Sequence, residues 1–257
     1  AATVTTGGDL VMVGTSWKGV KGLDDGYLVR RAADGKVTEM YFGGAGSDSF
    51  KAVAAGPDGG VWVVGSTASA GGKDAWVVRL NSNMQVYSDN PMGGAKDDEA
   101  TGVVVLADGS AFVVGSTLSF GAGKKDGRVW RMDGAGKVIW DYPFGSVEDD
   151  SFAAVCPDGL GGVVAVGTSG KNGATNPDGW AMSLTLDGDF GWNAPERFYG
   201  GAKADGLTAC AVGQLGQTLL AGSTTNAKGD TDGWLMAVDG SGIQQWQKSY
   251  DGGDFDA

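Results

Sequence analysis

The stretch that decides the fold runs from residue 93 to residue 144 and reads GGAKDDEATGVVVLADGSAFVVGSTLSFGAGKKDGRVWRMDGAGKVIWDYPF. Variants of this stretch recur along the whole chain. Each copy opens on a Gly-Gly pair or a close variant, and an aspartate follows five residues after the first glycine. The copies begin at residues 43, 93, 145, 200 and 251, so the repeat period is 50 to 55 residues. A period near 50 residues is typical of propellers, solenoids and arrays.

Within each copy, the hydrophobic pattern is that of β-strands. Valine-rich runs such as VWVVGST at 61–67 and AFVVGST at 111–117 are bounded by glycine, and runs such as DGWAMSL at 178–184 follow them. Valine and aromatic residues favour pleated strands, and Asp-Gly pairs such as Asp58-Gly59 supply the positive φ of hairpin turns. Four strands in about 50 residues, without helical periodicity, predict one β-propeller blade per copy.

The two ends of the chain are in phase with each other. Residues 251–257 open a copy and stop just after its aspartate, and residues 1–42 continue that copy. We therefore expect one all-β domain, a single five-bladed β-propeller with four antiparallel strands per blade, closed by both termini in one blade. The expected blades are residues 251–257 plus 1–42, 43–92, 93–144, 145–199 and 200–250.

Composition narrows the classes of partner and activity. The 257 residues carry a net charge of −12 and no histidine, which disfavours nucleic acids and anionic membrane surfaces as partners. No apolar run approaches the roughly 20 residues that span a bilayer. Without histidine, Ser-His-Asp and Cys-His catalysis and most zinc sites are excluded. A glycosidase needs two carboxylates in different environments, whereas this chain repeats equivalent ones. We expect a non-catalytic protein that is monomeric and has no resident cofactor.

The chain has two cysteines, Cys156 and Cys210. They follow Asp150 and Asp205 by six and five residues, on the expected innermost strands of the copies that begin at residues 145 and 200. Strand alternation therefore points their side chains to opposite faces. This geometry predicts two buried free thiols, with a disulfide or a ligand pair as the alternative. Two cysteines alone do not settle the compartment.

The order of the strands decides which loops share a face of the propeller. We name the strands of a blade A to D from the axis outward. The D–A and B–C loops then lie on one face, and the A–B and C–D hairpins lie on the other. The hairpins are uniform in sequence, whereas the B–C loops vary most. Variable loops on a rigid scaffold are where binding usually resides, so we expect partners on the D–A and B–C face.

Two sets of aspartates repeat with the blades. The first set enters strand A, and we take it as the candidate binding and metal-ligating set: Asp48, Asp98, Asp150, Asp205 and Asp256. The second set stands just before or at the start of strand C: Asp25, Asp74, Asp126, Asp178 and Asp232. The structural interpretation is that the side chains accept backbone N–H groups and hold the loops. The functional alternative is weak binding of Ca²⁺ or another hard divalent cation by carboxylate oxygens.

Aromatic residues fall into two groups. The repeated ones are expected to pack between blades: Tyr27, Trp76, Trp140, Trp180, Trp192, Trp234 and Trp246. Trp17 and Phe120 differ because they lie in B–C loops, where a propeller core does not need them. They are therefore candidate binding residues that would stack on a sugar or anchor a partner. Local packing within the loops is the alternative.

Together, these elements resemble a known repeat. The order GG-x-x-x-D, VVGST, DGW and D-x-x-G-x-x-x-W is similar to that of bacterial and archaeal quinoprotein-like β-propellers, and the last element is seen at Asp133, Gly136 and Trp140. The resemblance covers every copy, although Thr38 and Ser88 replace the last tryptophan in two of them. It implies a binding or scaffold role in an exported or surface protein, so a periplasmic or secreted location is expected. Ligands for a quinone cofactor have no match here.

The expected function is therefore that of a non-catalytic binding or scaffold propeller. We expect it to recognise a protein or other extracellular partner through the D–A and B–C face. The first alternative is a lectin-like propeller with one weak sugar site per blade, strengthened by multivalency. The second is binding of metal ions or a mineral surface through the aspartate rings. The third is a carboxylate-based glycosidase. The identity of the ligand does not follow from the sequence.

Overall fold

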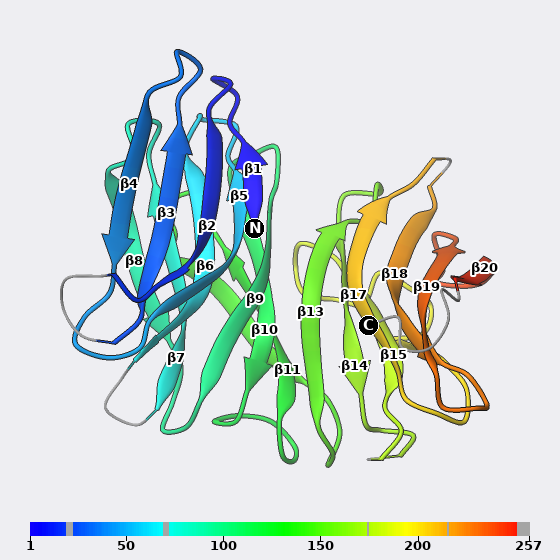
Figure 1. Ribbon diagram of the computed structural model, residues 1–257. Helices are drawn as coiled ribbons and strands as arrows, with labels where there is room; N and C mark the ends of the chain where they lie inside the picture. The colour runs from blue at the N-terminus through cyan, green and yellow to red at the C-terminus, as the bar shows by residue number, and fades with distance from the viewer. Residues whose placement is uncertain (19–22, 69–71, 174, 215, 251–257) are drawn as a thin grey trace. The chain divides into compact units, whose positions relative to one another are not determined.

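A computed structural model describes residues 1–18, 23–68, 72–173, 175–214 and 216–250 (Figure 1). Within these residues, twenty strands form five sheets, and each sheet consists of four antiparallel strands in chain order. The same residues contain no helix, and thus none long and apolar enough to cross a membrane. The all-β fold predicted from the repeat, a five-bladed β-propeller with four strands per blade, is confirmed.

Each blade is a meander of consecutive strands. Blade 1 comprises β1 (Ala2–Val4), β2 (Leu10–Ser16), β3 (Asp25–Arg31) and β4 (Val37–Phe42). Blade 2 comprises β5 (Ser49–Ala55), β6 (Val61–Ala68), β7 (Lys73–Leu80) and β8 (Val86–Met92). Blade 3 comprises β9 (Asp98–Val105), β10 (Ala111–Thr117), β11 (Asp126–Met132) and β12 (Val138–Phe144). Blade 4 comprises β13 (Asp150–Pro157), β14 (Val163–Ser169), β15 (Asp178–Leu184) and β16 (Arg197–Tyr199). Blade 5 comprises β17 (Asp205–Val212), β18 (Thr218–Thr225), β19 (Thr231–Val238) and β20 (Gln244–Tyr250).

The chain divides into two compact units. The first unit is Ala1–Phe120 with Val129–Tyr142, and the second is Gly121–Arg128 with Pro143–Ala257. Strand β11 therefore begins in the second unit and ends in the first. The predicted completion of blade 1 by residues 251–257 falls outside the described residues and stays a prediction.

Strand β6 shows why the B strands are almost continuously apolar. Val61 and Val63 pack in one buried cluster with Leu28 of blade 1. Val64, on the opposite face of the same strand, packs in another cluster with Val113 of blade 3. Alternate side chains thus meet two different neighbouring blades, and both faces of the sheet are removed from water. The packing of sheet on sheet, rather than a single central cluster, forms the core of each unit.

The glycine of the VVG motif sits opposite a β-bulge in strand A. In blade 2, the register shifts between Phe50 and Ala52, and Gly65 pairs with Phe50. A Cβ atom on Gly65 would lie 1.9 Å from the carbonyl oxygen of Ser49, so only glycine fits there. Equivalent shifts recur in the A strands of blades 3, 4 and 5. The bulge bends the strand as it enters the sheet and places the preceding aspartate at the blade edge.

The predicted packing between blades is seen for Trp76, which clusters with Leu28 of blade 1, and for Trp234, which clusters with Val164 of blade 4. The ring stacks, however, lie within a blade. Phe50 stacks on Trp76 with ring centroids 4.8 Å apart, and Phe152 stacks on Trp180 at 4.2 Å. Trp76, Trp180 and Trp234 are all buried. Trp246 is the exception, because it lies on the outer strand β20 and is 43% exposed. The prediction of inter-blade packing is wrong for this residue, since an outermost strand has side chains that no neighbour covers.

The prediction of two free thiols is wrong, because Cys156 and Cys210 form a disulfide with 5.8 Å between their Cα atoms. The bond joins β13 of blade 4 to β17 of blade 5, within the second unit. Alternation does point the two side chains to opposite faces of their own sheets. In adjacent blades, however, the forward face of one sheet meets the backward face of the next. Opposite facing therefore brings these two sulfur atoms together.

Candidate functional site

The aspartates that enter strand A hold two loops at once. Asp48 is 1% exposed, and its Oδ2 accepts the backbone N–H of Gly44 at 2.8 Å. Its Oδ1 accepts the backbone N–H of Ala68 at 2.9 Å and the hydroxyl of Thr67. One buried carboxylate thereby ties the D–A loop to the end of strand β6. These are charge-assisted bonds, which are roughly twice as strong as neutral ones.

The same arrangement recurs in the other described blades. Asp98 accepts the N–H of Gly94, Asp150 that of Ser146, and Asp205 that of Gly201. On their second oxygens, Asp150 accepts the N–H of Gly170, just after strand β14, and Asp205 accepts that of Thr225, at the end of strand β18. Asp256, the fifth candidate, lies outside the described residues. These contacts support the loop-holding interpretation of this set.

The carboxylate leaves no room for a side chain at the first glycine of the motif. A Cβ atom on Gly43 would lie 2.3 Å from Oδ2 of Asp48, and its φ of +142° is one that other residues rarely adopt. A Cβ atom on Gly93 would lie 2.1 Å from Oδ1 of Asp74 and 2.7 Å from Oδ2 of Asp98. The spacing of five residues between glycine and aspartate in the repeat is the spacing of this contact.

The second set of aspartates meets the first across these glycines. Asp126 and Asp150 both approach Gly145, and Asp178 and Asp205 both approach Gly200. Burial raises the pKa of Asp126, and the nearby Asp150 charge adds to the shift, while backbone N–H donors oppose it. Each of these D–A loops is thus lined by two carboxylates in little water. The two carboxylates repel each other, and hydrogen bonds from backbone N–H groups offset this repulsion.

Several of these oxygens have no hydrogen-bond partner among the described residues: Asp74 Oδ1, Asp98 Oδ1, Asp126 Oδ1 and Asp232 Oδ1. In that part of the chain, no three acidic, cysteine or histidine side chains gather in a metal-binding group. At Gly93, Gly145 and Gly200 the carboxylates come in pairs, and backbone donors occupy part of each pair.

The two loop aromatics differ from the repeated ones. Trp17 directly follows β2 and is 77% exposed. Phe120 follows β10 and is 42% exposed, and part of its ring lies against Gly94. Both residues belong to the first unit and lie at B–C loops, as predicted. An indole left in water on a loop is a typical anchor for a partner.

A pocket that sequence reasoning missed recurs in blades 2 and 5. In blade 2, Gly43, Thr67, Trp76, Asp89 and Pro91 line a cavity of about 450 Å³. The indole Nε1 of Trp76 donates a hydrogen bond to Oδ1 of Asp89 at 2.6 Å. The cavity therefore has an aromatic wall, a hydroxyl and a carboxylate whose orientation the indole determines. Its size is that of a small-ligand site.

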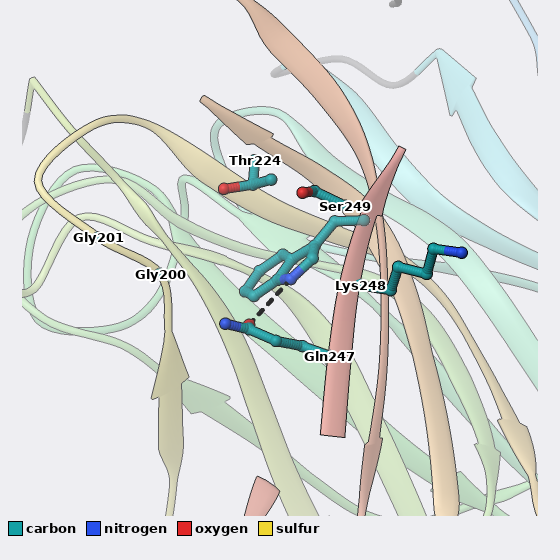
Figure 2. Close-up of a pocket in the computed structure, with 7 residues that line it drawn as sticks. Gly200, Gly201, Thr224, Gln247, Lys248 and Ser249 are labelled. Carbon is teal, nitrogen blue, oxygen red and sulfur yellow. Dashed lines mark hydrogen bonds between the residues drawn. The ribbon is translucent and has the colours of Figure 1, made fainter. Parts of the chain in front are cut away.

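Blade 5 repeats the pocket at matching positions (Figure 2). Its cavity of about 370 Å³ is lined by Gly200, Gly201, Thr224, Trp234, Gln247, Lys248 and Ser249. Trp234 donates from Nε1 to Oε1 of Gln247 at 3.1 Å. Figure 2 shows the side chain of Lys248 on the other side of its strand, pointing away from the indole. The two pockets share a frame, but an amide replaces the carboxylate in blade 5.

A signal for these pockets is present in the sequence. The D-strand acceptor stands 13 residues after the C-strand tryptophan both in blade 2 and in blade 5. The two residues look unrelated until the register of strands C and D is known. Trp76 pairs with Pro91 and Trp234 with Ser249, which places each acceptor two residues before the pairing partner.

Comparison with known proteins identifies the fold alone. No protein-family model matches the chain, and no curated protein matches it. Sqt1 from Chaetomium thermophilum, a β-propeller protein, matches over 96% of this chain and 58% of its own, with 16% identity and a TM-score of 0.54. A second structure of Sqt1 gives a TM-score of 0.53 at 16% identity, over 96% of this chain and 57% of its own. The chain therefore spans less than two thirds of the length of these structures.

Proposed function

We propose that this chain is a non-catalytic binding propeller that recognises a protein partner through its D–A and B–C loops. The observation that carries the proposal is Trp17, whose indole is 77% exposed on the B–C loop of blade 1. Burial of an exposed tryptophan at the centre of an interface typically contributes a large share of the binding free energy.

Two D–A loops of the first unit are held in place before any partner arrives. Asp48 and Asp98 bind backbone N–H groups of the D–A loops that enter blades 2 and 3. Loops that are already ordered lose little conformational entropy on binding. The loop-holding aspartates thus serve the binding role without contacting the partner.

Charge and covalent structure narrow the partner and the compartment. The net charge of −12 favours a basic partner over nucleic acids. The Cys156–Cys210 disulfide supports a periplasmic, surface or secreted location, because structural disulfides persist in oxidising compartments. The resemblance to quinoprotein-like propellers, which remains a prediction, points the same way.

The test is affinity capture of partners from an extracytoplasmic protein fraction, followed by direct binding of each purified candidate. Trp17→Ala and Phe120→Ala should each weaken binding of the true partner by about tenfold or more. Leu160→Ala is the matched control, because Leu160 is an exposed apolar residue on an A–B hairpin. A partner that binds all three variants equally would contradict the proposal.

A carbohydrate partner is the second candidate. The observation that favours it is the pocket of similar frame and size in blades 2 and 5. Repeated weak sugar sites gain strength when a polymer engages several of them. Binding of soluble polysaccharides that is lost in a Thr67→Val/Thr224→Val double variant, and kept in Trp17→Ala, would favour this candidate over a protein partner.

A further inference from the structure

In blades 2, 4 and 5, whose C strands carry a tryptophan at the same place, the acceptor of the indole N–H occupies one position. In strand D, it stands two residues before the residue that pairs with the C-strand aromatic. This acceptor position is filled as follows: Glu39 in blade 1, Asp89 in blade 2, Asp141 in blade 3, Glu196 in blade 4 and Gln247 in blade 5. Four of the five residues are acidic, so the position normally carries a charge.

Blade 4 shows how the chain neutralises that charge. Glu196 accepts the indole N–H of Trp180 on Oε2 at 3.1 Å. Its other oxygen, Oε1, forms an ion pair with the ammonium group of Lys171. Lys171 comes from the B–C loop, two residues after Ser169, and its ammonium group also lies over the ring of Phe198. A carboxylate at this position therefore holds an indole on one oxygen and a lysine on the other.

The other blades follow the same charge rule at the level of sequence. Blade 1 has Lys18 at the position of Lys171, to match Glu39. Blade 3 has Arg128 in place of the aromatic residue, to match Asp141. Blade 5 has Asn226 at the lysine position, and its acceptor is the neutral Gln247.

Blade 2 breaks the rule. Asp89 is acidic, but the lysine position holds Ser69 and the aromatic position holds Trp76. Oδ1 of Asp89 accepts the indole N–H, and within the described part of the chain no ion pair neutralises the carboxylate. Asp89 is exposed and lines the open cavity of about 450 Å³.

We propose that the blade 2 pocket binds a cationic side chain, lysine or arginine, of the protein partner. The incoming cation takes the place on Asp89 that Lys171 takes on Glu196 in blade 4. The carboxylate accepts a charge-assisted hydrogen bond from the cation while Oδ1 keeps the indole N–H of Trp76. This inference rests on the proposed function and assigns a specific residue class to the partner.

The pocket is suited to a side chain and less suited to a free metal ion. One carboxylate and one hydroxyl, of Asp89 and Thr67, are too few oxygen ligands for Ca²⁺, which takes six to eight. The hydroxyl proton of Thr67 already goes to Asp48, so this oxygen meets the pocket as an acceptor. The ring of Pro91 supplies an apolar wall for the methylene stem of a lysine.

The test uses synthetic peptides and the indole N–H resonances of the ¹⁵N-labelled protein. Trp76, Trp180 and Trp234 each report their own acceptor, since each donates to the residue at this position. Acetylated and amidated Gly-Lys-Gly and Gly-Arg-Gly should shift the Trp76 resonance in a saturable, salt-sensitive manner in the millimolar range. Gly-Glu-Gly should leave it unchanged, and the Trp234 resonance should not respond to any of the peptides.

Two variants sharpen the test. Asp89→Asn keeps an acceptor for the indole and removes the charge, so the affinity for the lysine peptide should fall at least tenfold. Lys171→Ala empties the internal cation position of blade 4, so the Trp180 resonance should begin to respond to the same peptide. No shift of Trp76 with either cationic peptide, or equal shifts of Trp76 and Trp234, would overturn the proposal.

The outcome is separable from that of the proposed function. The peptides need no natural partner, so a response at Trp76 stands even when no protein partner is captured through Trp17. Conversely, a captured protein that leaves the Trp76 resonance unmoved, and that binds Asp89→Asn as tightly as the unmodified protein, supports the proposed function and refutes the cation pocket.

Discussion

Blades 2 and 4 share a skeleton and differ in what has been added to it. Both stack a phenylalanine of strand A on a tryptophan of strand C, with interplanar angles of 22° and 17°. Both tie the D–A loop to a buried aspartate. Blade 4 adds a disulfide through Cys156 and an internal cation, Lys171, on its acceptor. Blade 2 has neither, since Ala54 stands where blade 4 has Cys156.

The comparison indicates that the contacts within a blade are the same in both repeats, whereas the residues at two other positions differ. One lies near the C-terminal end of strand A, where Cys156 of blade 4 meets Cys210 of blade 5. The other is the rim of the tryptophan pocket, which meets solvent or a partner. Blade 4 fills the two positions with Cys156 and Lys171, whereas blade 2 has Ala54 at the first and an open cavity at the second.

The largest expected effect is that of the disulfide. Its two cysteines are 54 residues apart, and in the chain-entropy model a loop of that length stabilises the folded protein by about 4 kcal/mol. Cys156→Ser combined with Cys210→Ser should lower the free energy of unfolding by an amount of this order in urea denaturation. Ala54→Ser, at the matching position of blade 2, is the control. Equal losses in both proteins would show that the bond adds nothing.

The loop-holding aspartates should come next. Asp48→Ala leaves the N–H groups of Gly44 and Ala68 without their charged acceptor, which should cost about 3 kcal/mol. Asp150→Ala should cost a similar amount, because its contacts are equivalent. The measurement is urea denaturation of both variants beside Asp187→Ala, a hairpin aspartate. A decrease in the free energy of unfolding in only one of the two variants would show that the two aspartates are not equivalent.

A smaller effect of opposite sign is expected for Asp126→Asn. Burial raises the pKa of Asp126, so its contribution favours the folded state below the ordinary value of 3.8 and is lost as the pH rises through the folded-state pKa. Asparagine does not ionise, so the variant does not lose stability in this way as the pH rises. Its melting temperature should therefore exceed that of the unmodified protein, by a margin that grows from about pH 4 to pH 7. A margin that shrinks over this range would contradict the assignment.

The smallest expected effect concerns divalent cations. Because backbone N–H groups occupy Asp48 and Asp150, melting temperatures measured with chelator and with millimolar Ca²⁺, Mg²⁺ or Mn²⁺ should agree. A rise with one cation that disappears in Asp98→Asn would instead support the metal alternative, with Oδ1 of Asp98 as the ligand.

The strands and turns of each blade follow from the sequence alone. Period-two runs of valine, Asp-Gly turns and a repeat of about 50 residues are local features, and they predict four strands per blade without knowledge of neighbouring sheets. The sequence also offers loop-holding, beside cation binding, as an interpretation of Asp48, because its spacing from the Gly-Gly pair is a local feature. A side chain that binds backbone a few residues away leaves its mark in the spacing of the sequence.

Only the tertiary structure decided which faces and registers meet. Alternation within one strand is visible in the sequence, but the pairing of Cys156 with Cys210 depends on which face of the next blade lies opposite. The contact of Trp76 with Asp89 depends on the register of two strands, which a turn and a register shift near the turn between them determine. The spacing from tryptophan to acceptor is 13 residues in blades 2 and 5 but 16 in blade 4, so the sequence spacing identifies the contact only after the register is known.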